Sequence, residues 1–198
     1  MCARACNLAH MALEHAILVS LAERPGSGYQ LSRQFAKSIG HFWSTTHQQI
    51  YRTLKKLQDQ GLITARDVAQ EGKPDKKIYQ LTHKGQEELS AWVATPTDLP
   101  QLRSDFGVKL RGAEHTDRAT IVSNVAHHRA LHAEQLALYR RYLATQFPSP
   151  DTLTGRQLHQ YLVLRGGITS EEAFLAWCDE ILTTLGTAPS KEEADDQP

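Results

Sequence analysis

Cysteine is scarce in this 198-residue sequence, and long apolar runs are missing. The three cysteines, Cys2, Cys6 and Cys178, are too few and too unevenly spaced for a disulfide framework. Apolar runs such as Ala16 to Leu21 fall far short of the ~20 residues that cross a bilayer, and the N-terminus has no apolar stretch typical of a secretory signal. We therefore expect a cytoplasmic protein without a membrane partner. Its 40% of hydrophobic residues suffice for a core that folds unaided.

The motifs of the large enzyme classes are also absent. The sequence contains no G-x-S-x-G, no phosphate-binding G-x-x-x-x-G-K, no G-x-G-x-x-G after a strand and no paired acidic motif. The segment Gly26-Ser27-Gly28 is interpreted as a helix breaker. We expect neither enzymatic activity nor a cofactor.

A net charge of zero hides two halves of opposite sign. Up to Thr95 the chain has 12 Lys and Arg against 8 Asp and Glu, a net charge of +4. From Pro96 onward it has 10 against 14, a net charge of −4, and Pro96 and Pro100 bracket the predicted linker. This asymmetry favours a polyanion-binding module joined to a second part.

The first half has the element order of a winged helix-turn-helix. Hydrophobic periodicity predicts helices over 8–23 and 29–37, and then a third helix that Ser44, Thr45 or Thr46 could cap, with Thr46 and Gln49 forming a capping box. Two β-prone runs, 62–68 and 77–81, flank a polar turn and predict a hairpin, followed by a helix capped by Thr82.

The third helix and the hairpin suit DNA. Ile50, Leu54 and Leu57 form its buried stripe, which leaves polar and basic side chains on the other faces. The helix N-terminus would attract a phosphate, its first side chains could reach base edges, and the hairpin lysines would meet flanking phosphates. The candidate DNA-binding residues are Thr45, Thr46, His47, Gln48, Tyr51, Arg52, Lys55, Lys73, Lys76 and Lys77.

The second half is predicted to be helical. A short piece over 102–110 precedes a long helix over 116–146, and two further helices are expected over 154–164 and 170–185. The long helix has two sides to bury and so requires a partner. The candidate dimerisation residues are Val125, His132, Leu136, Tyr139 and Leu143.

Three segments together resemble the PadR family of bacterial transcriptional regulators. They are Ala12 to Leu31, Gln49 to Ile63 and Lys77 to Gly85, and Arg165 to Trp177 resembles the helical dimerisation domain of the longer members. The family pattern begins near Met11, so residues 1–10 form an extension.

The resemblance implies a mainly α protein with a small β-hairpin wing. A winged helix-turn-helix DNA-binding domain would occupy residues 8–95, a helical dimerisation and effector domain residues 101–186, and a disordered tail residues 187–198. It further implies a homodimeric regulator, usually a repressor, on a palindromic double-stranded DNA operator. Tyr51 matches the family's recognition-helix tyrosine, which contacts the DNA backbone. Lys76 and Lys77 match the family's basic wing.

Some family members release DNA when phenolic or other aromatic compounds bind between the two domains. Trp92, close to the linker, is the candidate ligand-binding residue for such an effector.

Two alternatives remain open. Winged helices also serve as protein-interaction modules that do not touch nucleic acid. A metal- or redox-sensing regulator is the second, because Cys2, Cys6 and His10 share a helix face and His128 and His132 are spaced i, i+4. We expect no metal site, since neither set has the composition of a known motif.

Overall fold

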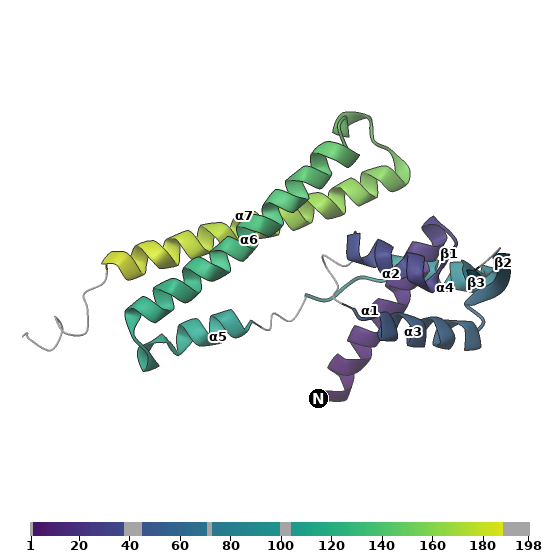
Figure 1. Ribbon diagram of the computed structural model, residues 1–198, viewed down its shortest axis with the longest axis horizontal. Helices are drawn as coiled ribbons and strands as arrows, with labels where there is room; N and C mark the ends of the chain where they lie inside the picture. Colours follow the sequence, from purple (N-terminus) through teal and green to yellow (C-terminus); the bar gives the residue numbers. More distant parts are fainter. Residues whose placement is uncertain (1, 38–44, 71–72, 100–103, 188–198) are drawn as a thin grey trace, which may run out of the picture. The chain divides into compact units, whose positions relative to one another are not determined.

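A computed structural model describes residues 2–37, 45–70, 73–99 and 104–187. The chain divides into two compact units, Met1–Leu99 and Pro100–Pro198, here called the N-terminal and C-terminal units. Each unit is built from elements that follow one another along the chain (Figure 1). The predicted tail lies outside the described residues from 188 onward, and Thr187 ends the last helix.

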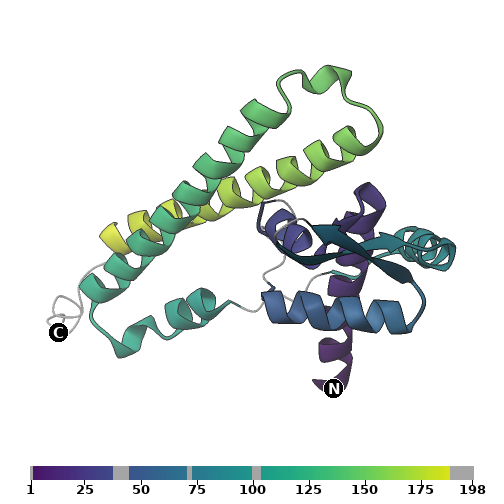
Figure 2. The same cartoon turned by 45° about the vertical axis from the view of Figure 1, so that its right-hand side comes forward.

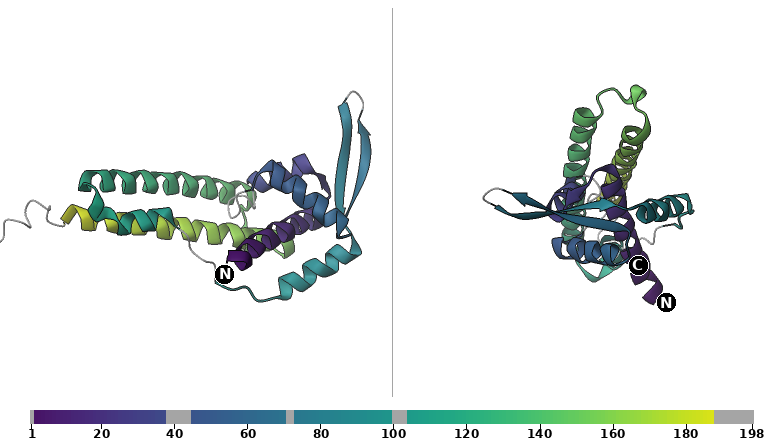
Figure 3. Two further views of the ribbon diagram at one scale, coloured as in Figure 1. Left: turned by 90° about the horizontal axis from the view of Figure 1, so that it is seen from below. Right: turned by 90° about the vertical axis from the view of Figure 1, so that its right-hand side faces the viewer.

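The N-terminal unit is a winged helix. Its elements are α1 (Cys2–Glu23), β1 (Gly26–Ser27), α2 (Gly28–Lys37), α3 (His47–Asp59), β2 (Ile63–Gln70), β3 (Lys73–Leu81) and α4 (His83–Ala94). The strands form an antiparallel sheet in the order β1-β3-β2. Apolar side chains from α1, α2, α3, α4 and the sheet form one core, in which Ile17, Leu54 and Leu57 are fully buried. The hairpin of β2 and β3 extends away from these helices (Figure 3).

The predicted capping box of α3 is confirmed. Thr46 is the N-cap residue, its Oγ1 accepts a hydrogen bond from the Gln49 N–H, and the Gln49 side chain accepts one from the Thr46 N–H at 2.9 Å. Ser27 and Gln30 repeat the same exchange at the start of α2, with distances of 3.0 and 3.3 Å. Each box satisfies two backbone donors that a helix end leaves unpaired, so both helix starts are firmly placed.

Strand β1 is an element that the sequence did not indicate. Gly26 pairs with Tyr79 and Ser27 with Ile78, so the segment interpreted as a helix breaker also adds a third strand to the hairpin. Two residues are too few to show a strand periodicity, and their partner lies some fifty positions away. The predicted mainly α winged helix fold is otherwise as expected.

The C-terminal unit is a long helical hairpin. It consists of α5 (Asp105–Arg111), a short turn of 3₁₀ helix, α6 (Arg118–Gln146), a second such turn, and α7 (Gly155–Thr187). Helices α6 and α7 lie side by side over most of their length (Figure 2). No helix within the described residues is long and apolar enough to span a membrane.

The two predicted helices over 154–164 and 170–185 are in fact one continuous helix, α7. Gly166 and Gly167 fall within the predicted break, and each costs a helix about 1 kcal/mol relative to alanine. The neighbouring side chains Leu164, Ile168 and Leu175 pack against α6 in one apolar cluster. Burial on a 29-residue partner outweighs the local preference of the glycines.

Candidate nucleic-acid interface

Helix α3 presents a polar ridge on the side opposite its buried stripe. Ile50, Thr53, Leu54 and Leu57 face the core. Gln48, Arg52 and Lys55 follow at i, i+4 and i+7 on the outer side, and all three are exposed. The ridge therefore offers an amide, a guanidinium and an ammonium group in line, which are donors suited to base edges and phosphates.

The predicted side chains at the helix start divide into two roles. The Thr46 hydroxyl caps the helix, and the Thr45 hydroxyl lies 3.3 Å from the Gln49 side-chain oxygen. His47 and Gln48 take no part in capping the helix, and both side chains are exposed. Of the four residues expected to read bases, His47 and Gln48 are thus the better placed.

Tyr51 lies on the flank of α3 that faces α2. Its side chain is 48% exposed. Its ring lies directly over Gly28, the first residue of α2. On the other flank, Lys56 forms an ion pair with Glu14 of α1, so this ammonium group is engaged within the unit.

The two wing lysines lie on opposite faces of the hairpin. Lys77 pairs with Asp67 and Lys76 with Val68 across the strands. Residues two apart on a strand share a face, so Lys77 shares the face of Tyr79, which packs into the core beneath the helices. Lys77 therefore lies on the side of α3, whereas Lys76 points to the opposite side. Lys73 begins β3, and its side chain lies outside the described part of the structure.

Three exposed side chains on α2 and the hairpin were not proposed as DNA contacts from the sequence. Tyr29 and Arg33 lie on α2, where the Arg33 guanidinium carbon is 6.0 Å from the centre of the Tyr29 ring. Arg66 lies on β2 opposite Ile78, on the hairpin face that also carries Lys76 and points away from α3. They lie outside the predicted third helix and outside the turn of the hairpin, where the sequence analysis placed the DNA contacts. Their exposure became apparent only from the packing of α2 and β2.

Comparison with known proteins finds a family model that matches each of the two units. The model of the "Transcriptional regulator PadR-like family" matches residues 17–91, and that of "Virulence activator alpha C-term" matches residues 102–186. The probable transcriptional regulator Rv1176c of Mycobacterium tuberculosis is 44% identical over 88% of this chain and 98% of its own length. The chain belongs to the PadR-like family of transcriptional regulators. Members of this family are DNA-binding winged helix regulators and not enzymes.

Other PadR-like relatives match over the same length. The negative transcriptional regulator PadR of Bacillus subtilis is 32% identical over 87% of this chain and 97% of its own. The crystal structure of that protein with operator DNA superposes with a TM-score of 0.79, at 28% identity, and covers 88% of this chain and 99% of the other. Its structure with p-coumaric acid gives a TM-score of 0.74 at 26% identity, covering 90% and 98%.

In this PadR-like chain, Trp92 stacks on a histidine. The ring centres of Trp92 and His15 are 4.4 Å apart and their planes differ by 8°. One face of the indole is therefore covered by α1. This leaves at most the other face for a ligand.

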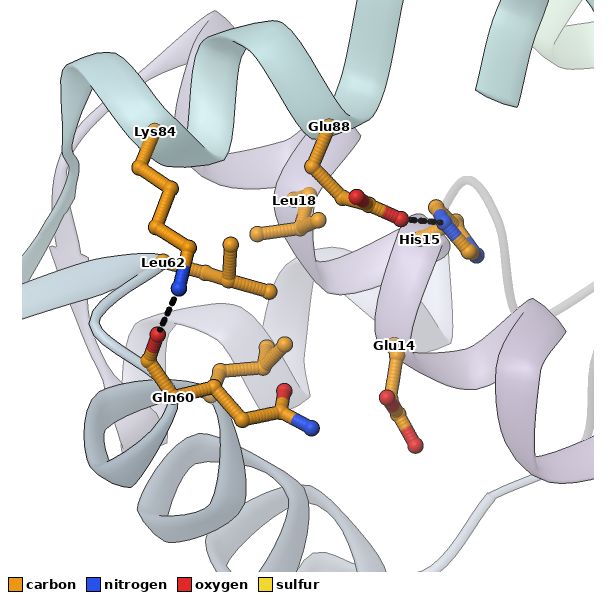
Figure 4. A pocket seen from close by; sticks show the side chains of 8 residues that line it. Glu14, His15, Leu18, Gln60, Leu62, Lys84 and Glu88 are labelled. Atoms are coloured by element: carbon orange, nitrogen blue, oxygen red, sulfur yellow. Dashed lines mark hydrogen bonds and ion pairs between the residues drawn. The ribbon is translucent and has the colours of Figure 1, made fainter. Parts of the chain in front are cut away.

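A pocket of about 300 Å³ lies beside His15, between α1, the end of α3 and α4 (Figure 4). Several of its polar lining groups are already paired. Lys84 donates to the Gln60 carbonyl at 2.8 Å, and the His15 Nε2 lies 3.6 Å from the Glu88 carboxylate. Trp92 is not among its lining residues. A ligand there would have to replace these internal contacts.

The residues predicted to mediate dimerisation are largely used inside the PadR-like C-terminal hairpin. Val125 packs with Cys178 and Ile181 in one apolar cluster. Leu136, Tyr139 and Leu143 pack with α7 residues in the other cluster, and His132 contacts Glu171 of α7. Their burial is therefore explained within one chain and does not by itself indicate a second copy.

Two histidines connect α6 to both neighbouring helices. The Nε2 atoms of His128 and His132 are 3.1 Å apart, and His132 Nδ1 contacts the Glu171 carboxylate. His128 stacks on Phe106 of α5 and His132 on Phe174 of α7. Within the described residues no three His, Cys, Asp or Glu side chains gather as metal ligands. The side chains of Cys2, Cys6 and His10 lie outside that part of the structure.

This cluster predicts that the stability of the fold decreases as the pH is lowered. Burial, the proximity of His132 and that of His127 lower the pKa of His128 below its ordinary value, with Glu171 opposing them. The unfolded chain then takes up a proton near pH 6.5, whereas the folded chain resists it. Stability is therefore lost as the pH falls through about 6.5 toward the lowered pKa of the folded state. Thermal unfolding at pH 7.5 and 5.5 should show a lower midpoint at pH 5.5.

The variant His128→Gln should flatten this dependence, and His159→Gln, at an exposed position of α7, should leave it unchanged. The pKa values of Asp117 and Asp179 are lowered by hydrogen bonds, so those carboxylates titrate well below this window. An equal pH dependence in wild type and His128→Gln would contradict the assignment.

Proposed function

We propose that this regulator is a homodimeric repressor that binds a roughly palindromic DNA operator through α3 and the wing. The observation that carries the proposal is the exposed ridge of Gln48, Arg52 and Lys55 on a capped helix, with Tyr51 on the flank of that helix. The operator complex of the B. subtilis relative supports it. A two-fold dimer would place two such helices in successive major grooves, about one helical turn apart.

We further propose that self-association uses the outer side of the α6 and α7 hairpin. Val125, Leu136 and Tyr139 hold the hairpin together from within. Leu131, Leu162 and Val163 are 50 to 55% exposed in the single chain, and a second copy would cover them. Leu131 lies on α6, and Leu162 and Val163 lie on α7, so both helices of the hairpin expose apolar side chains, as interfaces often do.

A small aromatic molecule is the proposed effector. The support is the p-coumaric acid complex of the B. subtilis relative, together with Trp92 on the last helix of the N-terminal unit. Binding would shift the spacing of the two α3 helices and weaken one half-site.

The test is binding of the full chain to DNA from upstream of its own gene, measured by fluorescence anisotropy. We expect the upstream duplex to bind roughly 10³-fold tighter than a scrambled duplex of the same length. Light scattering of the complex should give two chains per duplex, and p-coumaric acid should weaken binding. Failure to bind either duplex at any salt concentration would favour a protein-interaction module instead.

The wing lysines give a specific prediction. Lys77→Ala should weaken operator binding severalfold and reduce the slope of log affinity against log salt by about one, because one phosphate contact is lost. Lys76→Ala should have the smaller effect, because its side chain lies on the sheet face away from α3. Titrations at several salt concentrations measure both. A larger loss for Lys76→Ala would show that the other face of the wing meets the DNA.

A further inference from the structure

Gly28 leaves room for the ring of Tyr51. A Cβ atom built on Gly28 would lie 2.5 Å from Cε1 of Tyr51, 2.7 Å from Cζ and 3.0 Å from the hydroxyl oxygen. Real Cβ atoms do not approach other atoms this closely. The tyrosine ring can therefore occupy its position only because residue 28 has no side chain.

The backbone at Gly28 is held from several sides. Gly26 and Ser27 pair with β3, and the Ser27 N–H and Gln30 side chain close the capping box of α2. The Ser32 hydroxyl donates to the Gly28 carbonyl at 3.0 Å. A clash at residue 28 would therefore displace the tyrosine ring and not the glycine.

The Tyr51 ring packs against Gly28, but about half of the side chain is exposed to solvent. Burial raises the pKa of the Tyr79 phenol, and the proximity of Tyr51 and Asp67 adds to the rise, which places Tyr51 close to the sheet. Its side chain is nevertheless 48% exposed. The buried stripe of α3 is complete without it. The position of this ring therefore matters more for contacts with a binding partner than for the packing of the core.

We propose that Gly28 is a positioning residue for DNA binding, which holds the Tyr51 hydroxyl at the start of α2 so that α2 and α3 present one surface to the DNA backbone. This inference rests on the proposed function. Gly28 acts through Tyr51 and does not itself contact DNA. It gives the Gly28-Tyr29-Gln30-Leu31 segment a role that the sequence alone did not assign.

The test compares two glycine variants of the full chain. Gly28→Ala should weaken operator binding about tenfold, similar to Tyr51→Ala. Gly26→Ala is the matched control, because its Cβ would meet only Gln30, at 3.6 and 3.7 Å. We expect it to bind as wild type does. Thermal unfolding of each variant ensures that binding is measured on folded protein.

A double-mutant cycle separates positioning from a general structural effect. If Gly28 acts through Tyr51, then adding Gly28→Ala to Tyr51→Ala should cost no further affinity, because the clash is gone. A further tenfold loss in that background would overturn the proposal. So would wild-type affinity in Gly28→Ala. If the wild-type chain binds no operator, the proposed function fails. If the wild-type chain binds and Tyr51→Ala binds with the same affinity, the proposed function stands and only this inference fails.

Discussion

Gly85→Ala is expected to be strongly destabilising for the N-terminal unit. A Cβ at Gly85 would lie 2.1 Å from the Leu62 carbonyl oxygen and 3.0 Å from its carbonyl carbon. This obstacle is backbone, not the end of a flexible side chain. The same oxygen accepts hydrogen bonds from the Thr82 N–H at 3.1 Å and the Thr82 hydroxyl at 3.0 Å. Relief of the clash would break the cap of α4 or push the helix off the core.

We expect a loss of about 3 kcal/mol or more, a large share of the ~5–15 kcal/mol that stabilises a typical domain. Urea unfolding followed by circular dichroism would measure it. Gly26→Ala in the same unit is the control, since its Cβ has ordinary contacts. An unfolding midpoint for Gly85→Ala equal to that of the control would show that α4 can shift without cost.

Arg52→Ala should have the largest effect on DNA binding among single substitutions in α3. Arg52 is exposed at the middle of the ridge, between Gln48 and Lys55, and its guanidinium can bind a base edge or a phosphate with two hydrogen bonds. A contact of this kind is worth about 1–3 kcal/mol, so operator affinity should fall roughly 5- to 150-fold. Anisotropy titrations with the upstream duplex measure the change.

Lys56→Ala is the matched control for Arg52→Ala. It removes the same positive charge from the same helix, but this ammonium group is paired with Glu14. We expect a loss below about threefold, because only the long-range attraction to phosphates is reduced. Similar losses for the two variants would mean that overall charge, and not the ridge, controls binding.

Several features of the N-terminal unit could be predicted from the sequence. The capping box at Thr46 and Gln49, the buried stripe of Ile50, Leu54 and Leu57, and the cap at Thr82 all appear in the structure. Each depends on residues three or four positions apart, whose spacing alone brings them together. The exposed ridge of α3 follows from the same periodicity.

Other features could not be predicted because they join distant residues. Lys56 pairs with Glu14, 42 positions away, and β1 pairs with a strand that follows two helices later. The continuity of α7 depends on packing against α6. The stripe of Val125, Leu136 and Tyr139 correctly indicated a buried face but not which helix covers it.

By itself, the sequence determined the winged helix, the caps at Thr46 and Thr82 and the polar side of α3, because these follow from local periodicity and from hydrogen bonds between near neighbours. The tertiary structure alone decided that Lys77 and not Lys76 lies on the side of α3, that Lys56 is engaged, and that Gly28 supports Tyr51. These depend on strand register and on the packing of one element against another. Such contacts exist only when the whole unit is folded.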